Sequence, residues 1–351
     1  MSFRNLSPGR MFEALAAAHR PRLAFPGGGV AELQAWKGEA LPAVLATLGH
    51  SPPGVPARPQ LLAEWEHRGL RKQRWLIDVQ PHLAATCLVN LPPGAVEGTR
   101  YPAILCWHGH GPFGKEPVMG NDSSPELRAA IAAHNYDYGQ QMAQQGYVTY
   151  AIDWIGAGER NDEHKLNRRG SSGGHDWCDA YYLHATMLGM TPLSINLAHG
   201  RAATDFVCGL PWVDPTRLGV MGLSGGGTMA LWTALSDQRF RAVEIMCYSD
   251  LWAHFGMRDL NYCGMQVAPG LYALVDLPDL QGLLAPRPLL VDIGAYDTCF
   301  LVDTALACYG QVQSIYAAAE AAQRLELDLF PGEHGWGGNR SEAFFRRYLG
   351  E

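Results

Sequence analysis

Short apolar runs alternate with stretches of helical length along most of this 351-residue chain, and this alternation constrains the fold more than any other feature. The runs with the length of buried strands are "YPAILCWHG" (101–109), "GYVTYAID" (146–153), "RLGVMGL" (217–223), "AVEIMCY" (242–248), "RPLLVDIG" (287–294) and "RLELDLF" (324–330). Strands that alternate with helices favour a mostly parallel sheet covered on both faces. We therefore expect a doubly wound α/β fold.

The first 60 residues have a different pattern. Residues 8–49 carry apolar positions at helical spacing, and the Pro-rich stretch 51–59 has the composition of a linker. About 40 helical residues rarely form a core alone. We expect residues 1–60 to form a helical arm and linker, and residues 61–351 to form the α/β domain. The arm could pack on its own sheet or join two copies in a homo-oligomer.

Two intervals, 154–192 and 249–284, are longer than ordinary connections. Both begin where a predicted parallel strand ends, which is the edge at which ligands bind in open α/β sheets. We expect them to form pocket walls. The aromatic and histidine side chains expected to shape this pocket, each of which could instead belong to the core, are Trp154, Trp177, Tyr181, Tyr182, Trp252 and His254.

Charge and composition exclude several classes of protein. The formal net charge is −7 and no basic stripe is present, so we expect no nucleic-acid partner. The N-terminus lacks the apolar segment of a signal peptide, and no run of about 18 apolar residues predicts a membrane span. We expect a cytoplasmic protein. Its eight cysteines form no C-x-x-C pair, which indicates buried thiols rather than disulfides.

A glycine-rich segment, Gly222-Leu223-Ser224-Gly225-Gly226-Gly227, lies between a predicted strand and a predicted helix. Gly-x-Ser-x-Gly at a strand-to-helix turn is typical of a nucleophile elbow, in which a sharp turn exposes the serine hydroxyl. Phosphate-binding loops need a lysine that is missing here. The pattern also occurs by chance in structural turns, so the decision rests on the partners of Ser224.

A serine nucleophile needs a histidine base and an acid that orients the histidine. Two loops beyond later strands supply both in the order that this type of fold uses, with Asp297 in "AYDTCF" and His334 in "PGEHGWGG". Asp250 follows another strand and is a rival acid, and Asp303 is a weaker one. We predict the triad Ser224, Asp297 and His334.

An oxyanion hole needs two backbone N–H groups directed at the substrate oxygen. Gly225 follows the nucleophile at the start of a helix, whose dipole favours negative charge. The second donor is expected in the loop "CWHGHG" (106–111), where His110 lies between two glycines. We therefore predict the N–H groups of His110 and Gly225 as the oxyanion donors.

Two other kinds of site share residues or patterns with this part of the chain. Gly109-x-Gly111-x-x-Gly114 matches a dinucleotide-binding fingerprint, but the three prolines of the following segment leave no helix to receive a pyrophosphate. Candidate metal ligands are His108, His110, His164, His175, Asp176 and His184. Their spacing matches no known metal motif, so we expect neither a cofactor nor a metal.

Six segments spread over most of the chain resemble those of a known superfamily: "LQAWKGEALPAVLATLG" (33–49), "HGHG" (108–111), "AIDWIGAGER" (151–160), "GVMGLSGGG" (219–227), "LLAPRPLLVDIGAYD" (283–297) and "PGEHGW" (331–336). The chain resembles the α/β-hydrolases, closest to the acetyl-xylan-esterase-like and dienelactone-hydrolase-like serine esterases. The resemblance implies the triad and oxyanion donors predicted above. Dienelactone hydrolases proper use a cysteine nucleophile, and similar deacetylases often carry glutamine where this chain has Gly225.

These observations predict a serine carboxylic-ester hydrolase that works through an acyl-enzyme. The resemblance implies a small-molecule ester substrate with a short or acetyl acyl group. Two alternatives stay open, because the same triad can cleave amides and because the fold can lose its activity. They are a peptidase or amidase similar to prolyl oligopeptidase, and a catalytically silent binding protein.

Overall fold

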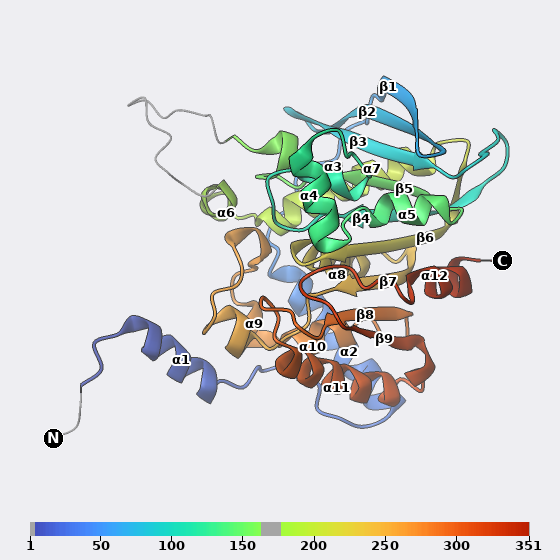
Figure 1. Ribbon diagram of the computed structural model, residues 1–351. Coiled ribbons are helices and arrows are strands. Elements are labelled where there is room, and N and C mark those ends of the chain that lie inside the picture. Colours follow the sequence, from blue (N-terminus) through green and yellow to red (C-terminus); the bar gives the residue numbers. More distant parts are fainter. Residues whose placement is uncertain (1–3, 163–176, 351) are drawn as a thin grey trace, which may run out of the picture.

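The computed structural model describes residues 4–162 and 177–350, which form one nine-stranded sheet flanked by helices (Figure 1). The strand order is β1-β2-β3-β5-β4-β6-β7-β8-β9. The strands are β1 (Gln60–His67), β2 (Leu70–Gln80), β3 (Leu83–Leu91), β4 (Tyr101–Trp107), β5 (Val148–Ile152), β6 (Val213–Leu223), β7 (Phe240–Met246), β8 (Leu289–Gly294) and β9 (Leu325–Phe330). From β5 to β9 all neighbours are parallel, whereas β1, β2, β3 and β5 pair antiparallel. The predicted fold class is confirmed.

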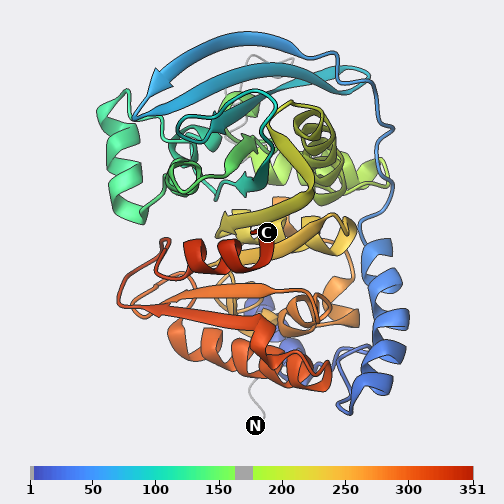
Figure 2. The same cartoon turned by 90° about the vertical axis from the view of Figure 1, so that its right-hand side faces the viewer.

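Helices cover both faces of the twisted sheet (Figure 2). The α-helices are α1 (Pro8–Ala18), α2 (Val30–Ala46), α3 (Lys115–Val118), α4 (Pro125–His134), α5 (Tyr138–Gln144), α6 (Trp177–Met187), α7 (Pro192–Cys208), α8 (Gly225–Ser236), α9 (Leu271–Leu274), α10 (Leu277–Gly282), α11 (Val302–Ala318) and α12 (Ser341–Leu349). Shorter turns are η1 (Gly158–Arg160), η2 (Trp252–Gly256), η3 (Gly264–Gln266) and η4 (Ala322–Arg324).

The core has two parts, one on each face of the sheet. Side chains of α2, α7, α8, α10 and α11 pack on one face, and those of α5 and α12 pack on the other. The strands between them are buried on both sides, which is why they read as continuous apolar runs in the sequence. Edge strand β1 departs furthest from this pattern, since it is exposed at nearly every position, and it was not predicted as a strand.

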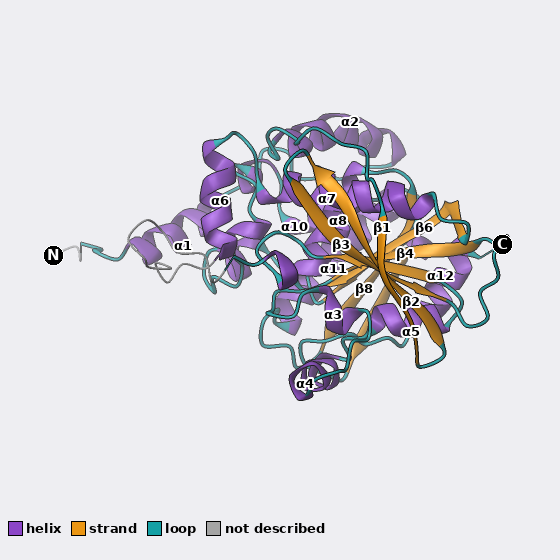
Figure 3. Ribbon diagram, turned by 90° about the horizontal axis from the view of Figure 1, so that it is seen from above, coloured by secondary structure: helices purple, strands orange, loops and turns teal. Residues whose placement is uncertain are grey.

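The two helices of the predicted arm behave differently. Leu33, Trp36 and Val44 of α2 are buried in the main core, so α2 packs on its own chain. In contrast, α1 projects from the body on the same side as α6 (Figure 3). Met11, Phe12 and Leu15 are among its exposed apolar side chains, at 45–59% exposure. Oligomer formation through the arm stays a prediction, as does the domain boundary.

The two long intervals follow strands of the parallel part of the sheet, and their role as pocket walls stays a prediction. The first follows β5 and contains η1 and α6, with residues 163–176 outside the described part of the chain. The second follows β7 and contains η2, η3, α9 and α10. Within the described ranges, we find no helix with the length and hydropathy required to cross a membrane.

Candidate active site

Ser224 lies at the turn between β6 and α8 with φ 59° and ψ −119°, a strained conformation for a residue with a side chain. Its own N–H donates to the Met246 carbonyl at 2.8 Å, which fixes the turn to β7. Side chains at the two flanking glycine positions would clash with the backbone. A Cβ on Gly222 would lie 2.2 Å from the Gly226 carbonyl oxygen, and one on Gly226 would lie 2.2 Å from that of Trp107. The segment therefore has the geometry of a nucleophile elbow.

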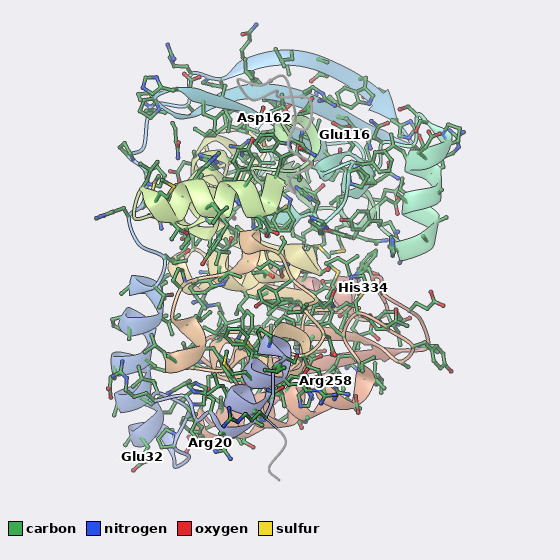
Figure 4. The ribbon with its side chains drawn as sticks, turned by 90° about the vertical axis from the view of Figure 1, so that its left-hand side faces the viewer. Arg20, Glu32, Glu116, Asp162, Arg258 and His334 are labelled. Atoms are coloured by element: carbon green, nitrogen blue, oxygen red, sulfur yellow. The ribbon has the colours of Figure 1, made fainter. Side chains whose placement is uncertain are left out.

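Asp297 and His334 meet beyond the carboxyl ends of β8 and β9. His334 Nδ1 lies 2.8 Å from Asp297 Oδ2, and the other carboxylate oxygen accepts the N–H groups of Cys299 and Phe300. The Asp297 side chain is almost fully buried, whereas that of His334 keeps some exposure. Figure 4 labels His334, which lies between the upper and lower parts of the molecule in that view. The arrangement leaves Nε2 of the ring available for a second partner.

The electrostatics of the two candidate acids differ. Burial alone would raise the pKa of Asp297, but the hydrogen bond and charge of His334 lower it below its ordinary value. Burial raises the pKa of Asp250 to about 6, and its Oδ1 accepts the N–H of Leu251 at 2.6 Å. The imidazole is thus paired with Asp297, while Asp250 has its own local partner.

The end of α4 holds the His334 loop, a feature that the sequence did not reveal. His134 Nδ1 lies 2.6 Å from the His334 carbonyl oxygen, and the His134 carbonyl accepts the Trp336 N–H at 2.9 Å. Asn135 donates its side-chain amide to the Trp336 carbonyl. Phe300 stacks on the His334 ring with centroids 5.9 Å apart. These contacts fix the orientation of the histidine.

A buried ionic group fixes the loop that contains His110. Asp153, at the end of β5, accepts both the backbone N–H and the ammonium group of Lys115 at 2.7 Å each. Glu159 also accepts from the Lys115 ammonium group, at 2.6 Å. At the start of the same loop, the Gly109 N–H donates to the Tyr136 hydroxyl at 2.5 Å. Its two ends are therefore tied to β5 and to the residues that follow α4.

Ser224 and His334 line one small cavity of about 150 Å³. The loop after β4 contributes Gly109 to Gly114, including His110, and Pro117, Ala130, His134, Tyr136 and Leu223 complete the lining. The structure thus brings together three of the predicted site residues. None of the six predicted pocket side chains lines this cavity. Trp154 and Trp252 are buried, and the other four are partly buried in the two long intervals.

The match to a known family covers most of the chain. A family model described as "Abhydrolase family" matches residues 3–326.

The chain belongs to the Abhydrolase family.

Relatives and solved structures agree with this family. YtaP of Bacillus subtilis (strain 168), provisionally named a hydrolase, is 26% identical over 249 residues, which cover 70% of this chain and 77% of YtaP. A Bacteroides fragilis protein provisionally described as an acetyl xylan esterase (BF1801) superposes with a TM-score of 0.72 at 20% identity, covering 93% of this chain and 83% of that one. A glucuronoyl esterase from Solibacter usitatus superposes with a TM-score of 0.63 at 16% identity, covering 93% and 96%. The predicted membership of the α/β-hydrolases is confirmed.

The structure gives a steric reason for glycine at position 225, which the sequence did not reveal. A Cβ at this position would lie 2.2 Å from the indole carbon Cη2 of Trp154, which is fully buried. The ring of Trp154 in turn packs edge-on against His108, with centroids 5.0 Å apart. The tryptophan therefore occupies the space that a glutamine side chain would need after the nucleophile.

Replacing Gly225 by alanine is expected to destabilise the protein by about 1–3 kcal/mol, because overpacking forces neighbouring groups apart. Denaturant unfolding of both proteins measures the difference. Gly310→Ala is the matched control, since Gly310 lies within α11 and a Cβ there would meet nothing within 4 Å. That change should stabilise by about 0.5–1 kcal/mol. If Gly225→Ala unfolds like the wild type, the tryptophan does not fill this space.

A buried carboxyl group lies beneath the His334 loop. Glu244 Oε1, on β7, accepts the Trp336 indole N–H at 3.0 Å and the Ser341 hydroxyl at 2.6 Å. Burial raises the pKa of Glu244 to about 7, although these two hydrogen bonds act in the opposite direction. Burial and the charge of Glu244 also raise the pKa of Asp292 well above its ordinary value.

This raised pKa predicts how stability depends on pH. Because the folded state holds the Glu244 proton to about pH 7 and the unfolded state releases it near 4.5, stability should fall as pH rises between these values. Glu244→Gln should flatten this fall and raise stability at pH 8 by about 3 kcal/mol. Thermal unfolding from pH 5 to pH 8 measures it. An unchanged slope in the variant would contradict the assignment, and Glu342→Gln, on the exposed side of α12, is the control.

Proposed function

We propose that this protein is a serine carboxylic-ester hydrolase that acts through an acyl-enzyme. The observation that carries the proposal is that Ser224 and His334 line one cavity while His334 is hydrogen bonded to Asp297. These are the three groups that nucleophilic catalysis by serine requires, in the chain order of this fold. Family membership and the esterase neighbours support the same reaction class.

The roles follow from the hydrogen bonds. His334 Nδ1 is directed to Asp297, so Nε2 is the nitrogen that takes the Ser224 proton. Ser224 Oγ then forms a bond to the ester carbonyl carbon, and collapse of the tetrahedral intermediate breaks the bond to the alcohol oxygen. The proton on Nε2 passes to the departing alcohol. Water repeats the sequence on the acyl-enzyme and releases the acid.

Two N–H groups are proposed to hold the oxyanion. Gly225 is the first residue of α8, so its N–H has no partner within the helix and points along a favourable dipole. His110 lies in the cavity-lining loop, between ends tied to Tyr136 and Asp153. A donor held in place before the reaction needs little reorganisation when charge develops.

The size of the cavity supports a short acyl group. Drug-sized ligands occupy cavities of roughly 300–1,000 Å³, whereas this cavity measures about 150 Å³. Part of its lining is apolar, from Pro112, Phe113, Pro117 and Ala130. We propose an acetyl or similarly small acyl group as the one bound there.

A panel of p-nitrophenyl esters tests the proposal. We expect kcat/KM to fall by at least about ten-fold from the acetate to the octanoate, a difference of about 1.4 kcal/mol in transition-state stabilisation. A fluorophosphonate probe should label Ser224, as identified by peptide mass spectrometry. Intact esters of every length together with no labelling would refute the esterase. Faster cleavage of peptide anilides than of esters would favour the peptidase instead.

A further inference from the structure

A histidine and two cysteines from three separate segments meet beside the Ser224 cavity. They are His110 in the loop after β4, Cys178 in the first turn of α6, and Cys263 directly before η3. One ring nitrogen of His110 and the two sulfur atoms all lie within 4.8 Å of one another. We propose that these three side chains form a binding site for a thiophilic divalent cation of the zinc class.

The donor set selects the ion. Two thiolates and one imidazole favour Zn²⁺ over Mg²⁺ or Ca²⁺, which prefer oxygen ligands. Bond lengths of about 2.3 Å to sulfur and 2.0–2.1 Å to nitrogen place tetrahedral ligand atoms about 3.4–3.8 Å apart. The three atoms are within 4.8 Å of one another here. Side-chain rotations that bring these atoms about an ångström closer together would complete the geometry. Three protein ligands leave a fourth position for water or another small ligand.

The backbone already holds the two thiols next to each other. Asp179, adjacent to Cys178, accepts the N–H of Gly264, adjacent to Cys263, at 2.7 Å. A Cβ on Gly264 would lie 2.5 Å from the Cβ of Tyr182, so α6 and η3 are in close contact. This pairing does not depend on an ion. Binding would therefore require little rearrangement of the chain.

The third ligand connects the proposed site to the cavity. His110 is exposed and also lines the cavity that contains Ser224 and His334. An ion on its imidazole would lie at the edge of that cavity and restrict the side chain next to the proposed oxyanion donor. Ion binding itself rests only on the cluster, so it can be measured independently of any ester hydrolysis.

The sequence did not predict this site. The three ligands are far apart in the chain and form none of the short spacings that identify zinc motifs. Of the candidate metal ligands in the sequence, His110 takes part and His108 and His184 do not. The other three, His164, His175 and Asp176, lie outside the described residues. The proposal departs from the expectation that the protein binds no metal.

Cobalt titration of the reduced, chelator-treated full chain tests the site. We expect one Co²⁺ per chain, with sulfur-to-cobalt charge-transfer absorption that disappears when Zn²⁺ displaces the cobalt. Cys178→Ser and Cys263→Ser should each weaken Zn²⁺ binding by more than about 100-fold, because loss of mere outer-shell partners already costs 10–100-fold. Cys208→Ser, at a partly exposed cysteine on α7, is the matched control and should bind like the wild type.

A second variant and peptide mapping of the unreduced protein complete the test. His110→Ala alters an exposed side chain, so it should fold even if replacement of the buried Cys178 does not, and it too should lose tight binding. Absence of the charge-transfer band, or a band that survives both cysteine variants, would overturn the proposal. So would a Cys178–Cys263 disulfide, found by peptide mapping of unreduced protein, if the reduced protein binds no Co²⁺.

Discussion

Ser224→Ala should reduce kcat for p-nitrophenyl acetate by about 10⁶-fold, because the hydroxyl that attacks the carbonyl is removed and the described cavity lining holds no other serine and no cysteine. The oxyanion donors would remain, so hydrolysis about 10³–10⁴-fold above that in water is expected to persist. Folding should be little affected, since alanine keeps the Cβ that already occupies the strained backbone position. Steady-state kinetics measures the loss, and circular dichroism checks the fold.

A serine outside the cavity serves as the control, because its replacement by alanine shows any effect on turnover that does not come from loss of the nucleophile. Ser314 lies on α11, where its hydroxyl donates to the Gly310 carbonyl of the same helix. Ser314→Ala should therefore keep wild-type turnover. Retention of activity and of fluorophosphonate labelling in Ser224→Ala would show that another group is the nucleophile.

Asp297→Asn should lower kcat by about 10⁴-fold. The amide keeps the size of the side chain, but it cannot stabilise the imidazolium that forms when His334 takes the serine proton. Its NH₂ group can also face Nδ1 at the 2.8 Å contact and force the wrong tautomer. The KM should change far less than kcat, because no substrate contact is removed.

Asp250→Asn is the matched control for the acid. Its carboxylate accepts the N–H of Leu251 and is not the partner of His334. We expect its kcat to stay within about ten-fold of the wild type, equivalent to 1.4 kcal/mol. If Asp250→Asn abolishes turnover while Asp297→Asn keeps it, the acid has been assigned to the wrong loop.

The elements and the candidate triad were predictable because local signals encode them. Apolar runs between helical stretches marked the parallel strands from β4 to β9. The glycines around Ser224 are required by contacts within the turn and with β4, so their spacing is visible in the sequence. Asp297 and His334 each follow a strand directly, which places them at one edge of the sheet. Strand β1 was missed because an exposed edge strand has no buried apolar run.

The contacts that support the proposed triad could not be predicted, since they join residues that are remote in the chain. His134 lies 200 positions from His334, and nothing in "AAIAAH" indicates that it contacts that loop. Trp154 was expected in a pocket wall, but the missing side chain of Gly225 lets it pack beneath the elbow. Which aromatic residues of a long insertion face a cavity depends on how the insertion folds, and its composition does not encode this.

The position of β9 has a consequence for how activity is lost. Strand β9 is the last strand of the sheet and pairs only with β8, yet it leads directly to His334. Edge strands open locally more readily than central ones, so fluctuations of β9 could displace the histidine while the rest of the sheet remains intact. The hydrogen bond from Trp336 to Glu244 on β7 counters this, because it fastens the loop to an inner strand. The working lifetime of this protein would then be set by one anchored loop rather than by its global stability.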